Sequence, residues 1–194
     1  MERRPVKFEV ILAGFGGQGI LFAGNLLAQA GMEAGLRVTF LPVYGPEMRG
    51  GTCNCTVVLS DREIASPVVT RPRALVIMNL PSFEKFVPRL KPRGLAVVNE
   101  NLVPRERAAG FPGRRFLFLP ADDLAEEEGA PGLANMAALG ALVAATRVVP
   151  PEKVLSGLQS LLPEHRRHLL EPNRRVFNRG YEFALRNSAT ASER

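Results

Sequence analysis

The sequence has few of the residues that hold metal ions and redox clusters. It contains two cysteines and two histidines in 194 residues. Iron–sulfur clusters are normally held by four cysteines, and a structural zinc ion needs four ligands, which this chain cannot assemble with only His165 and His168 in reserve. Any redox cluster on which the protein depends must therefore lie on another chain.

The few cysteines and histidines have simpler explanations. Cys53 and Cys55 are separated by one residue on a predicted strand, so their side chains share a face and are too close for ordinary disulfide geometry. We expect two packed thiols. His165 and His168 lie in Glu-His-Arg-Arg-His, and the flanking arginines favour an exposed segment over an acid–base site.

The chain also lacks long apolar runs. None approaches the roughly 20 residues that a membrane-spanning helix requires, and no charged, apolar and small-residue leader follows Met1. Apolar residues make up 46% of the chain, and no repeat or linker divides it. We expect a cytoplasmic protein with one domain over residues 1–185 and a disordered tail over 186–194.

Lysine is scarce, so the formal net charge of +6 comes mostly from arginine. The arginines are scattered and lack the interleaved aromatic residues of an RNA-stacking surface, which argues against a nucleic-acid partner. Either these arginines form a solvated surface, or they pair with carboxylates of an acidic partner subunit, for which the planar guanidinium is suited. The second is our functional hypothesis.

Hydrophobic periodicity predicts alternating strands and helices. The expected strands are residues 6–13, 37–43, 53–60, 74–78, 95–99 and 115–119, and the expected helices are 20–35, 82–90, 133–148, 151–162 and 173–185. This order indicates an α/β fold with a single doubly wound, mostly parallel, Rossmann-like sheet and flanking helices. Residues 64–69 can add an antiparallel edge hairpin with 53–60, and the acidic run 126–129 is expected to be a solvated loop.

Three glycines with the spacing G-x-G-x-x-G join the first strand to the first helix. Gly14 is expected to allow a tight turn, Gly16 to let another group approach the main chain, and Gly19 to let the helix pack against the strand. A second glycine-rich segment, residues 44–52, follows the next strand. Both loops should therefore leave the sheet at the same edge.

No complete active site accompanies these loops. A dinucleotide site requires an acidic residue about 20 residues after the glycines, but here the strand runs into Tyr-Gly-Pro at 44–46. Asp122 and Asp123 are adjacent and read as turn or cap residues. Asn135 begins an apolar helix, where a cap or first-turn donor is expected, with a contact to the glycine loops as a second option.

Polar residues are concentrated around the two loops. Gln18, Glu47, Arg49, Thr52 and Asn54 predict a shared contact surface for another molecule. The alternative is a local ion pair between Glu47 and Arg49, worth under about 1 kcal/mol on an exposed loop.

With these residues, the chain closely resembles the gamma subunit of 2-oxoacid:ferredoxin oxidoreductases. The similarity rests on Gly-Phe-Gly-Gly-Gln-Gly at 14–19, Tyr-Gly-Pro-Glu-Met-Arg-Gly-Gly at 44–51, Asn-Cys-Thr-Val at 54–57, Ser-Pro at 66–67, Leu-Lys-Pro-Arg-Gly at 90–94 and Asn-Met-Ala-Ala-Leu-Gly at 135–140. Residues 1–185 thus resemble the gamma-type domain of pyruvate/ketoisovalerate oxidoreductases. The form of the second motif is most similar to the 2-oxoglutarate branch.

The resemblance implies a subunit that is inactive alone. Thiamine diphosphate, magnesium, iron–sulfur clusters and coenzyme A would be held on or between alpha, beta and ferredoxin-like delta subunits, and ferredoxin would accept the electrons. This chain would bind no cofactor alone and contribute no catalytic or metal-binding residue. The residues expected to face a partner or coenzyme are Gly14, Gly16, Gly17, Gln18, Gly19, Tyr44, Glu47, Arg49, Gly50, Gly51 and Asn54.

One alternative remains open from the glycine fingerprint alone, namely a stand-alone nucleotide- or coenzyme-A-binding module. Exposed partner-binding surface could also make the isolated chain self-associate into a homo-oligomer.

Overall fold

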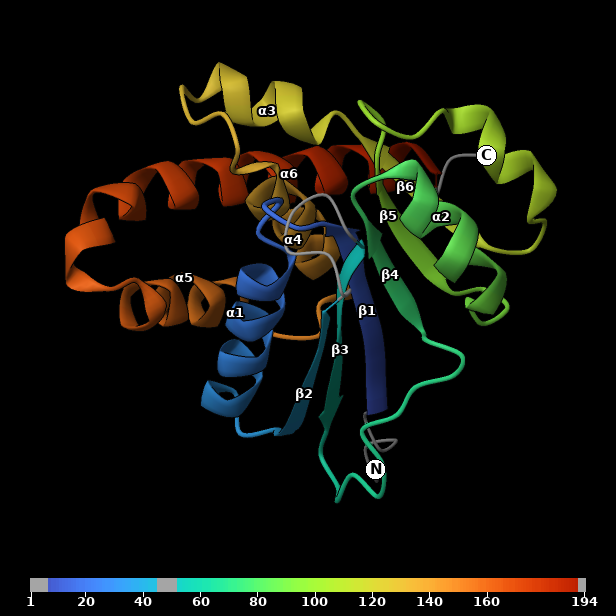
Figure 1. Cartoon of the computed structure of the whole chain (residues 1–194), viewed down its shortest axis with the longest axis horizontal. Coiled ribbons are helices and arrows are strands. Elements are labelled where there is room, and N and C mark those ends of the chain that lie inside the picture. The colour runs from blue at the N-terminus through green and yellow to red at the C-terminus, as the bar shows by residue number, and fades with distance from the viewer. Residues whose placement is uncertain (1–6, 45–51, 192–194) are drawn as a thin grey trace.

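The computed structural model describes residues 7–44 and 52–191 as one six-stranded sheet with helices on both faces (Figure 1). The strands are β1 (Lys7–Phe15), β2 (Arg37–Tyr44), β3 (Thr52–Ser60), β4 (Ala74–Ile77), β5 (Leu95–Asn99) and β6 (Arg115–Leu119). The helices are α1 (Ile20–Glu33), α2 (Leu80–Phe86), α3 (Ala121–Glu127), α4 (Ala134–Thr146), α5 (Pro151–Leu161) and α6 (Leu170–Ala191), with short 3-10 segments η1 (Val87–Arg89), η2 (Arg105–Gly110) and η3 (Glu164–Leu169). The predicted α/β fold class is confirmed.

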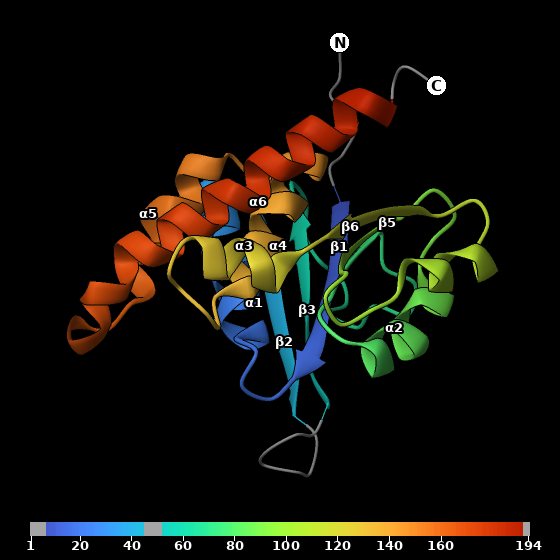
Figure 2. The same cartoon turned by 90° about the horizontal axis from the view of Figure 1, so that it is seen from above.

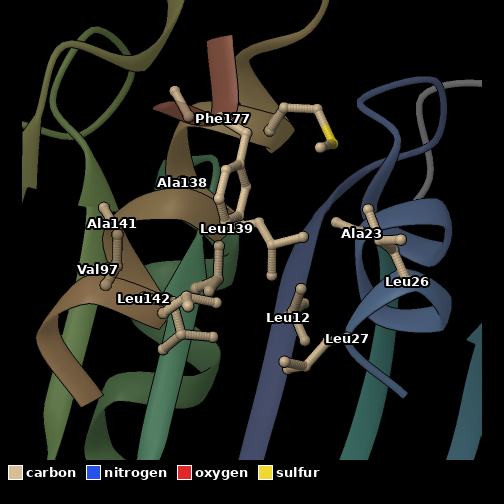
Figure 3. Packing of buried hydrophobic residues seen from close by; sticks show 14 of the residues in the cluster. Leu12, Ala23, Leu26, Leu27, Val97, Ala138, Leu139, Ala141, Leu142 and Phe177 are labelled. Carbon is tan, nitrogen blue, oxygen red and sulfur yellow. The ribbon is translucent and has the colours of Figure 1, made fainter. Parts of the chain in front are cut away.

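Alternating side chains of β1 enter two separate apolar cores. Val10 and Leu12 face the larger core, which includes residues of α1, α4 and α6, whereas Ile11 and Ala13 face the smaller core under α2. Figure 3 shows Leu12 lying between the leucines of α1 and those of α4. Because β1 is buried on both faces, it reads as a continuous apolar run, which is the pattern that predicted it.

The sheet is mixed, with the order β2-β3-β1-β4-β5-β6. β1, β4, β5 and β6 are parallel, as predicted, but β3 runs antiparallel between β1 and β2. β1 and β2 are therefore not neighbours, although the predicted doubly wound, mostly parallel sheet would place them side by side. An internal antiparallel strand that is buried on both faces has the same apolar pattern as a parallel one, so periodicity does not distinguish them.

The prediction of a hairpin between residues 53–60 and 64–69 is wrong. Residues 64–69 form no strand, and β3 pairs with β2 on one side and β1 on the other. Val57, Val58 and Leu59 are fully buried, which requires an internal position, whereas Val68 is 66% exposed beside Pro67. The hydrogen-bonding edges of β3 are thus already occupied.

Two further boundaries differ from the sequence prediction. The acidic run 126–129 is not simply a loop, because α3 includes Glu126 and Glu127, and Glu128 pairs with Arg175 and Arg179 of α6 at 3.2 and 3.3 Å. Helix α6 extends to Ala191, so the helix end at residue 185 was wrong and residues 186–191 are helical. Arginines of α6 and carboxylates at the end of α3 neutralise each other across this contact.

The contact between α4 and α6 depends on two glycines. Figure 2 shows α6 as the long helix that runs diagonally past α3 and α4. A Cβ built on Gly140 would lie 2.1 Å from the carbonyl oxygen of Phe177, and one on Gly180 would lie 1.9 Å from that of Ala137. The two helix backbones therefore approach more closely than any side chain would permit.

We expect Gly180→Ala to destabilise the fold by about 3 kcal/mol, because the added methyl group meets main-chain atoms that cannot rotate away. On an open helix face the same change would be favourable, since alanine is the better helix former. Urea unfolding measures the difference. Gly110→Ala is the matched control, because nothing lies within 4 Å of its Cβ, and its effect should stay within about 0.5 kcal/mol. Equal effects of the two changes would contradict the close contact.

Candidate functional site

The first glycine-rich segment and both ends of the second lie at one edge of the sheet, as predicted. The end of β1 pairs with the start of β3 through Phe15 and Thr52, and the end of β2 pairs with β3 through Tyr44 and Cys53. β4, β5 and β6 are parallel to β1, so their carboxyl ends lie at this edge too. We call it the carboxyl edge. It is the edge at which open α/β sheets bind their ligands.

Part of the predicted site lies outside the described residues. Glu47, Arg49, Gly50 and Gly51 fall in 45–51, so their roles stay predictions. Tyr44 ends β2 immediately before them. Asn54 is buried within β3, opposite Ala13 of β1, on the face away from the two cysteines.

The first glycine has a different role from the one expected. Gly14 is still part of β1 and does not form the turn. A Cβ at this position would lie 2.6 Å from Oε1 of Gln18 and 3.0 Å from Cβ of Met78, so the glycine provides space for a neighbouring side chain. The turn itself uses Gly17 and Gly19, which have φ angles of +99° and +69°. Gly16 and Gly17 are exposed, so main chain is accessible there.

Gln18 connects the ends of two neighbouring strands. Its Oε1 accepts a hydrogen bond from the Phe15 N–H at 2.7 Å, and its Nε2 donates to the Met78 carbonyl at 3.2 Å. β1 and β4 lie side by side at this point. The Gln18 amide therefore fixes the conformation of the loop, because both its oxygen and its nitrogen form hydrogen bonds to the main chain.

Asn135 contacts the loop from the start of α4. Its Nδ2 donates to the Gly19 carbonyl at 3.1 Å, and the side chain is buried. A Cβ on Gly19 would lie only 2.5 Å from Nδ2. The contact between Asn135 and the glycine loop, which was the second option after a capping role, is therefore present. Oδ1 of Asn135 is buried and has no hydrogen-bond partner among the described residues.

The sequence analysis missed further buried polar residues at this edge. Asn79 follows β4 and caps α2, accepting the Ser82 N–H at 2.9 Å, while Nδ2 of Asn79 and Oγ of Ser82 have no partner in the described part of the chain. Asn99 ends β5 and donates to Asp122 at 2.7 Å. An asparagine at or just after the end of β4 and of β5 was the available signal, because asparagine favours caps and turns there.

Among the described residues, the unpaired buried polar atoms at this edge belong to neutral side chains, namely Asn79, Ser82 and Asn135. Amides and a hydroxyl provide hydrogen-bond donors and acceptors but no proton-transfer pair. No group of three metal-ligating side chains occurs among residues 7–44 and 52–191. His165 and His168 lie on the exposed η3 segment, as expected. The described groups at this edge can therefore bind another molecule through hydrogen bonds.

Both cysteines are free and share the face of β3 that packs on α1, which confirms the packed-thiol prediction. Oxidation is not favoured, because burial raises the pKa of Cys53 and raises that of Cys55 to about 12. A Cβ on Gly24 of α1 would lie 2.3 Å from Sγ of Cys55, so the thiol occupies space that a glycine leaves open.

We expect Cys55 to resist alkylation in the folded protein. With a pKa of about 12 the thiolate fraction at pH 8 is about 10⁻⁴, and only the thiolate is nucleophilic. Iodoacetamide labelling followed by mass spectrometry should show Cys55 reacting at least about 100-fold more slowly than in the urea-unfolded chain, with the rate rising as the pH rises. Cys53, which is less buried, serves as the internal comparison. A Cys55 rate equal to that of the unfolded chain would contradict this environment.

The contact of Gly19 with Asn135 predicts a non-additive pair of substitutions. Gly19→Ala should cost about 2 kcal/mol, because alanine is strained at positive φ and its methyl group displaces Asn135. Gly17→Ala is the control, because it introduces the same backbone strain at positive φ but no steric contact, since nothing lies within 4 Å of its Cβ. It should cost about 1 kcal/mol. In an Asn135→Ala background the Gly19→Ala cost should fall to about that value. Urea unfolding of the four chains measures the coupling, and strict additivity would argue against it.

Comparison with known proteins places the chain in one group. The family model described as pyruvate ferredoxin/flavodoxin oxidoreductase matches residues 9–183. The chain is 34% identical to the 2-oxoglutarate synthase subunit KorC of Methanocaldococcus jannaschii, over 95% of this chain and 98% of the relative. It is 33% identical to the ketoisovalerate oxidoreductase subunit VorA of Methanothermobacter thermautotrophicus, over 93% of this chain but only 37% of that relative.

The fold agrees with this grouping. The chain superposes with a TM-score of 0.77 on the crystal structure of the keto/oxoacid ferredoxin oxidoreductase gamma subunit of Geobacter sulfurreducens, at 31% identity, covering 92% of this chain and 98% of the other. Among the described residues, none of the helices has both the length and the hydropathy of a membrane span.

Proposed function

Since the chain belongs to the pyruvate ferredoxin/flavodoxin oxidoreductase family, we propose that it is the gamma subunit of a 2-oxoacid:ferredoxin oxidoreductase and supports an active site carried by partner subunits. The observation that carries this proposal is the match in length. The chain spans 98% of a separate 2-oxoglutarate synthase subunit and 98% of a gamma-subunit structure, but only about a third of VorA. It corresponds to one whole subunit in some relatives and to part of a longer chain in another.

The proposed reaction requires groups that do not fit this chain. A 2-oxoacid loses carbon dioxide, its acyl group passes to coenzyme A, and two electrons pass to ferredoxin. Thiamine diphosphate supplies the decarboxylation chemistry and iron–sulfur clusters carry the electrons. The described residues provide neither a cluster of carboxylates for a magnesium diphosphate nor a set of thiolates for a cluster, and burial raises the pKa of both thiols. We therefore assign those groups to alpha, beta and delta subunits.

The described residues instead support a docking role for the carboxyl edge. Gln18 and Asn135 hold the loop at its two ends, and Gly16 and Gly17 leave its main chain exposed between them. A partner backbone can approach there without meeting a side chain. Glu47 and Arg49 would add directional polar contacts at the rim.

The rival hypothesis, a stand-alone nucleotide- or coenzyme-A-binding module, is less well supported. A dinucleotide site also needs an acidic residue about 20 residues after the glycines to bind the ribose. In this sequence the second strand runs into Tyr-Gly-Pro at 44–46 instead.

For the substrate we propose 2-oxoglutarate. The motif at 44–51 is most similar to the 2-oxoglutarate branch, and one relative that this chain matches over 98% of its length is a 2-oxoglutarate synthase subunit. 2-Ketoisovalerate is the competing substrate, because VorA has nearly the same identity to this chain.

Coexpression with alpha, beta and delta homologues tests the function. We expect the chain to copurify with them, and the complex to reduce ferredoxin with coenzyme A and 2-oxoglutarate faster than with 2-ketoisovalerate. The isolated chain should show no turnover. A thermal-shift assay of the isolated chain with NAD(P), FAD and coenzyme A is the second arm, since a ligand at 100 times its dissociation constant stabilises by roughly 2.7 kcal/mol. Copurification failure combined with such a shift would favour the rival hypothesis.

The same complex tests the docking loop. Arg49→Glu should reduce assembly or turnover while leaving the melting temperature of the isolated chain unchanged. Arg62→Glu is the matched control, because it makes the same charge change next to Ser60, which pairs with Lys7 at the opposite edge of the sheet. Full assembly and turnover with Arg49→Glu would contradict the role of the loop.

A further inference from the structure

A cavity of about 770 Å³ lies at the opposite edge of the sheet from the glycine loops. It is lined by four arginines, Arg73, Arg93, Arg115 and Arg147, together with apolar residues that include Phe8. Phe8 is near the start of β1, Arg73 immediately precedes β4, and Arg115 is the first residue of β6. This amino-edge cavity is therefore separate from the site described above.

The four arginines are not neutralised within the described chain. No acidic side chain lines the cavity, and none of the four guanidinium groups forms an ion pair or side-chain hydrogen bond among residues 7–44 and 52–191. Glu9, whose carbonyl accepts the Arg73 N–H at 2.9 Å, uses its carboxylate for Lys7 and Lys91 instead. Four like charges around one hollow repel each other, and an anionic occupant would relieve that repulsion.

Two of these arginines have an unfavourable backbone conformation. Arg93 and Arg147 have φ angles of 59° and 52°, and no other non-glycine residue in the described ranges has a positive φ. Each uses its own N–H in a main-chain bond of 2.8 Å, to Gly113 and Val143 respectively, which glycine would make equally well. The turns therefore do not require a side chain, and the side chains that bear the strain both line the cavity. Favourable interaction with a helix C-terminus accounts for Arg147 only.

The other lining residues indicate the kind of anion. Leu36, Leu95 and Val148 add apolar surface beside the arginines. The lining residues Ala34 and Arg147 directly follow the carboxyl ends of α1 and α4, whereas α5 begins beside the lining residue Pro150. The helix termini therefore place more negative than positive partial charge around the cavity. A phosphate deep inside would meet that negative charge. Carboxylates at the level of the exposed guanidinium groups, with an apolar side chain below them, match the surface better.

From these observations we infer that the amino-edge cavity receives an acidic segment of a companion subunit, with carboxylates paired to the four arginines and an apolar side chain on the cavity floor. The inference rests on the proposed function, because it takes the companion to be another subunit of the same oxidoreductase. It adds a second contact surface, at the opposite edge of the sheet from the glycine loops, and it gives the excess of arginine a location.

The test compares charge reversals in the coexpressed complex. Arg73→Glu with Arg115→Glu changes two cavity arginines, neither of which has a positive φ, so the isolated variant should keep the native melting temperature. We expect its association with the partner subunits to weaken at least about 10-fold at low salt. The difference in affinity between the native chain and this variant should be smaller in 1 M salt, where the Debye length is about 3 Å. Arg166→Glu with Arg167→Glu, on the exposed η3 segment, makes the same charge change outside the cavity and should stay within about twofold of the native chain.

A second variant separates binding from stability. Arg93→Gly with Arg147→Gly removes two cavity side chains and their strain, so we expect a melting temperature no lower than native together with weaker association. A lower melting temperature with native association would show that these side chains serve the fold, and would overturn the inference.

The remaining outcomes are also decisive. If the Arg73→Glu, Arg115→Glu chain associates with the partner subunits as tightly as the native chain, the inference is overturned but the proposed function is not. If the native chain itself does not associate, the proposed function is contradicted as well. Inorganic tripolyphosphate is the small-anion probe. If it raises the melting temperature of the native chain but not of the reversed variant, while both chains assemble equally, the cavity is a small-anion site and not a subunit contact.

Discussion

The structure depends on the burial of β1 on both faces. This strand is the only one described that contacts both the antiparallel part of the sheet, through β3, and the parallel part, through β4. Its nine residues extend over roughly 30 Å. Because side chains on both faces are fixed in apolar cores, neither end of β1 can shift in register without moving polar groups into a core. The glycine loop at one end of β1 and the amino-edge cavity at the other are therefore held apart by about the length of this strand.

This arrangement suits a subunit that makes contacts at two edges. Among the described residues, the carboxyl edge offers exposed main chain and amide side chains, so recognition by these groups depends on shape and hydrogen-bond direction. The amino-edge cavity offers four guanidinium groups without described partners, so recognition there is electrostatic and sensitive to salt. The two modes of contact are physically independent. A partner that engages both edges would fix the orientation of this subunit as well as its position.

The sequence was sufficient for features that depend on local pattern. Continuous apolar runs located β1, β4 and β5, and the C-x-C spacing placed Cys53 and Cys55 on one buried face. It was insufficient where pairing decides the outcome, as with β3, whose burial on both faces is compatible with either strand direction. The glycine spacing also wrongly predicted a turn at Gly14, because it does not reveal that the Gln18 side chain occupies the space beside this glycine.

The cavity illustrates a limit of a different kind. Arg73, Arg93, Arg115 and Arg147 are far apart along the chain and belong to no periodic pattern, so in the sequence they are indistinguishable from solvated arginines. They come together because the starts of parallel strands align at one edge: Arg73 immediately precedes β4, Arg93 lies two residues before β5, and Arg115 begins β6. Arg147 caps helix α4, which packs over those strands. Parallel topology thus converts a residue placed before each strand into a cluster. The same logic at the carboxyl ends brings Gln18, Asn79 and Asn99 to the other edge, and it gives the two edges opposite chemical character, amide at one and guanidinium at the other. A sheet with alternating strand directions would have mixed the two sets, which is why the parallel half of this sheet carries both proposed contacts.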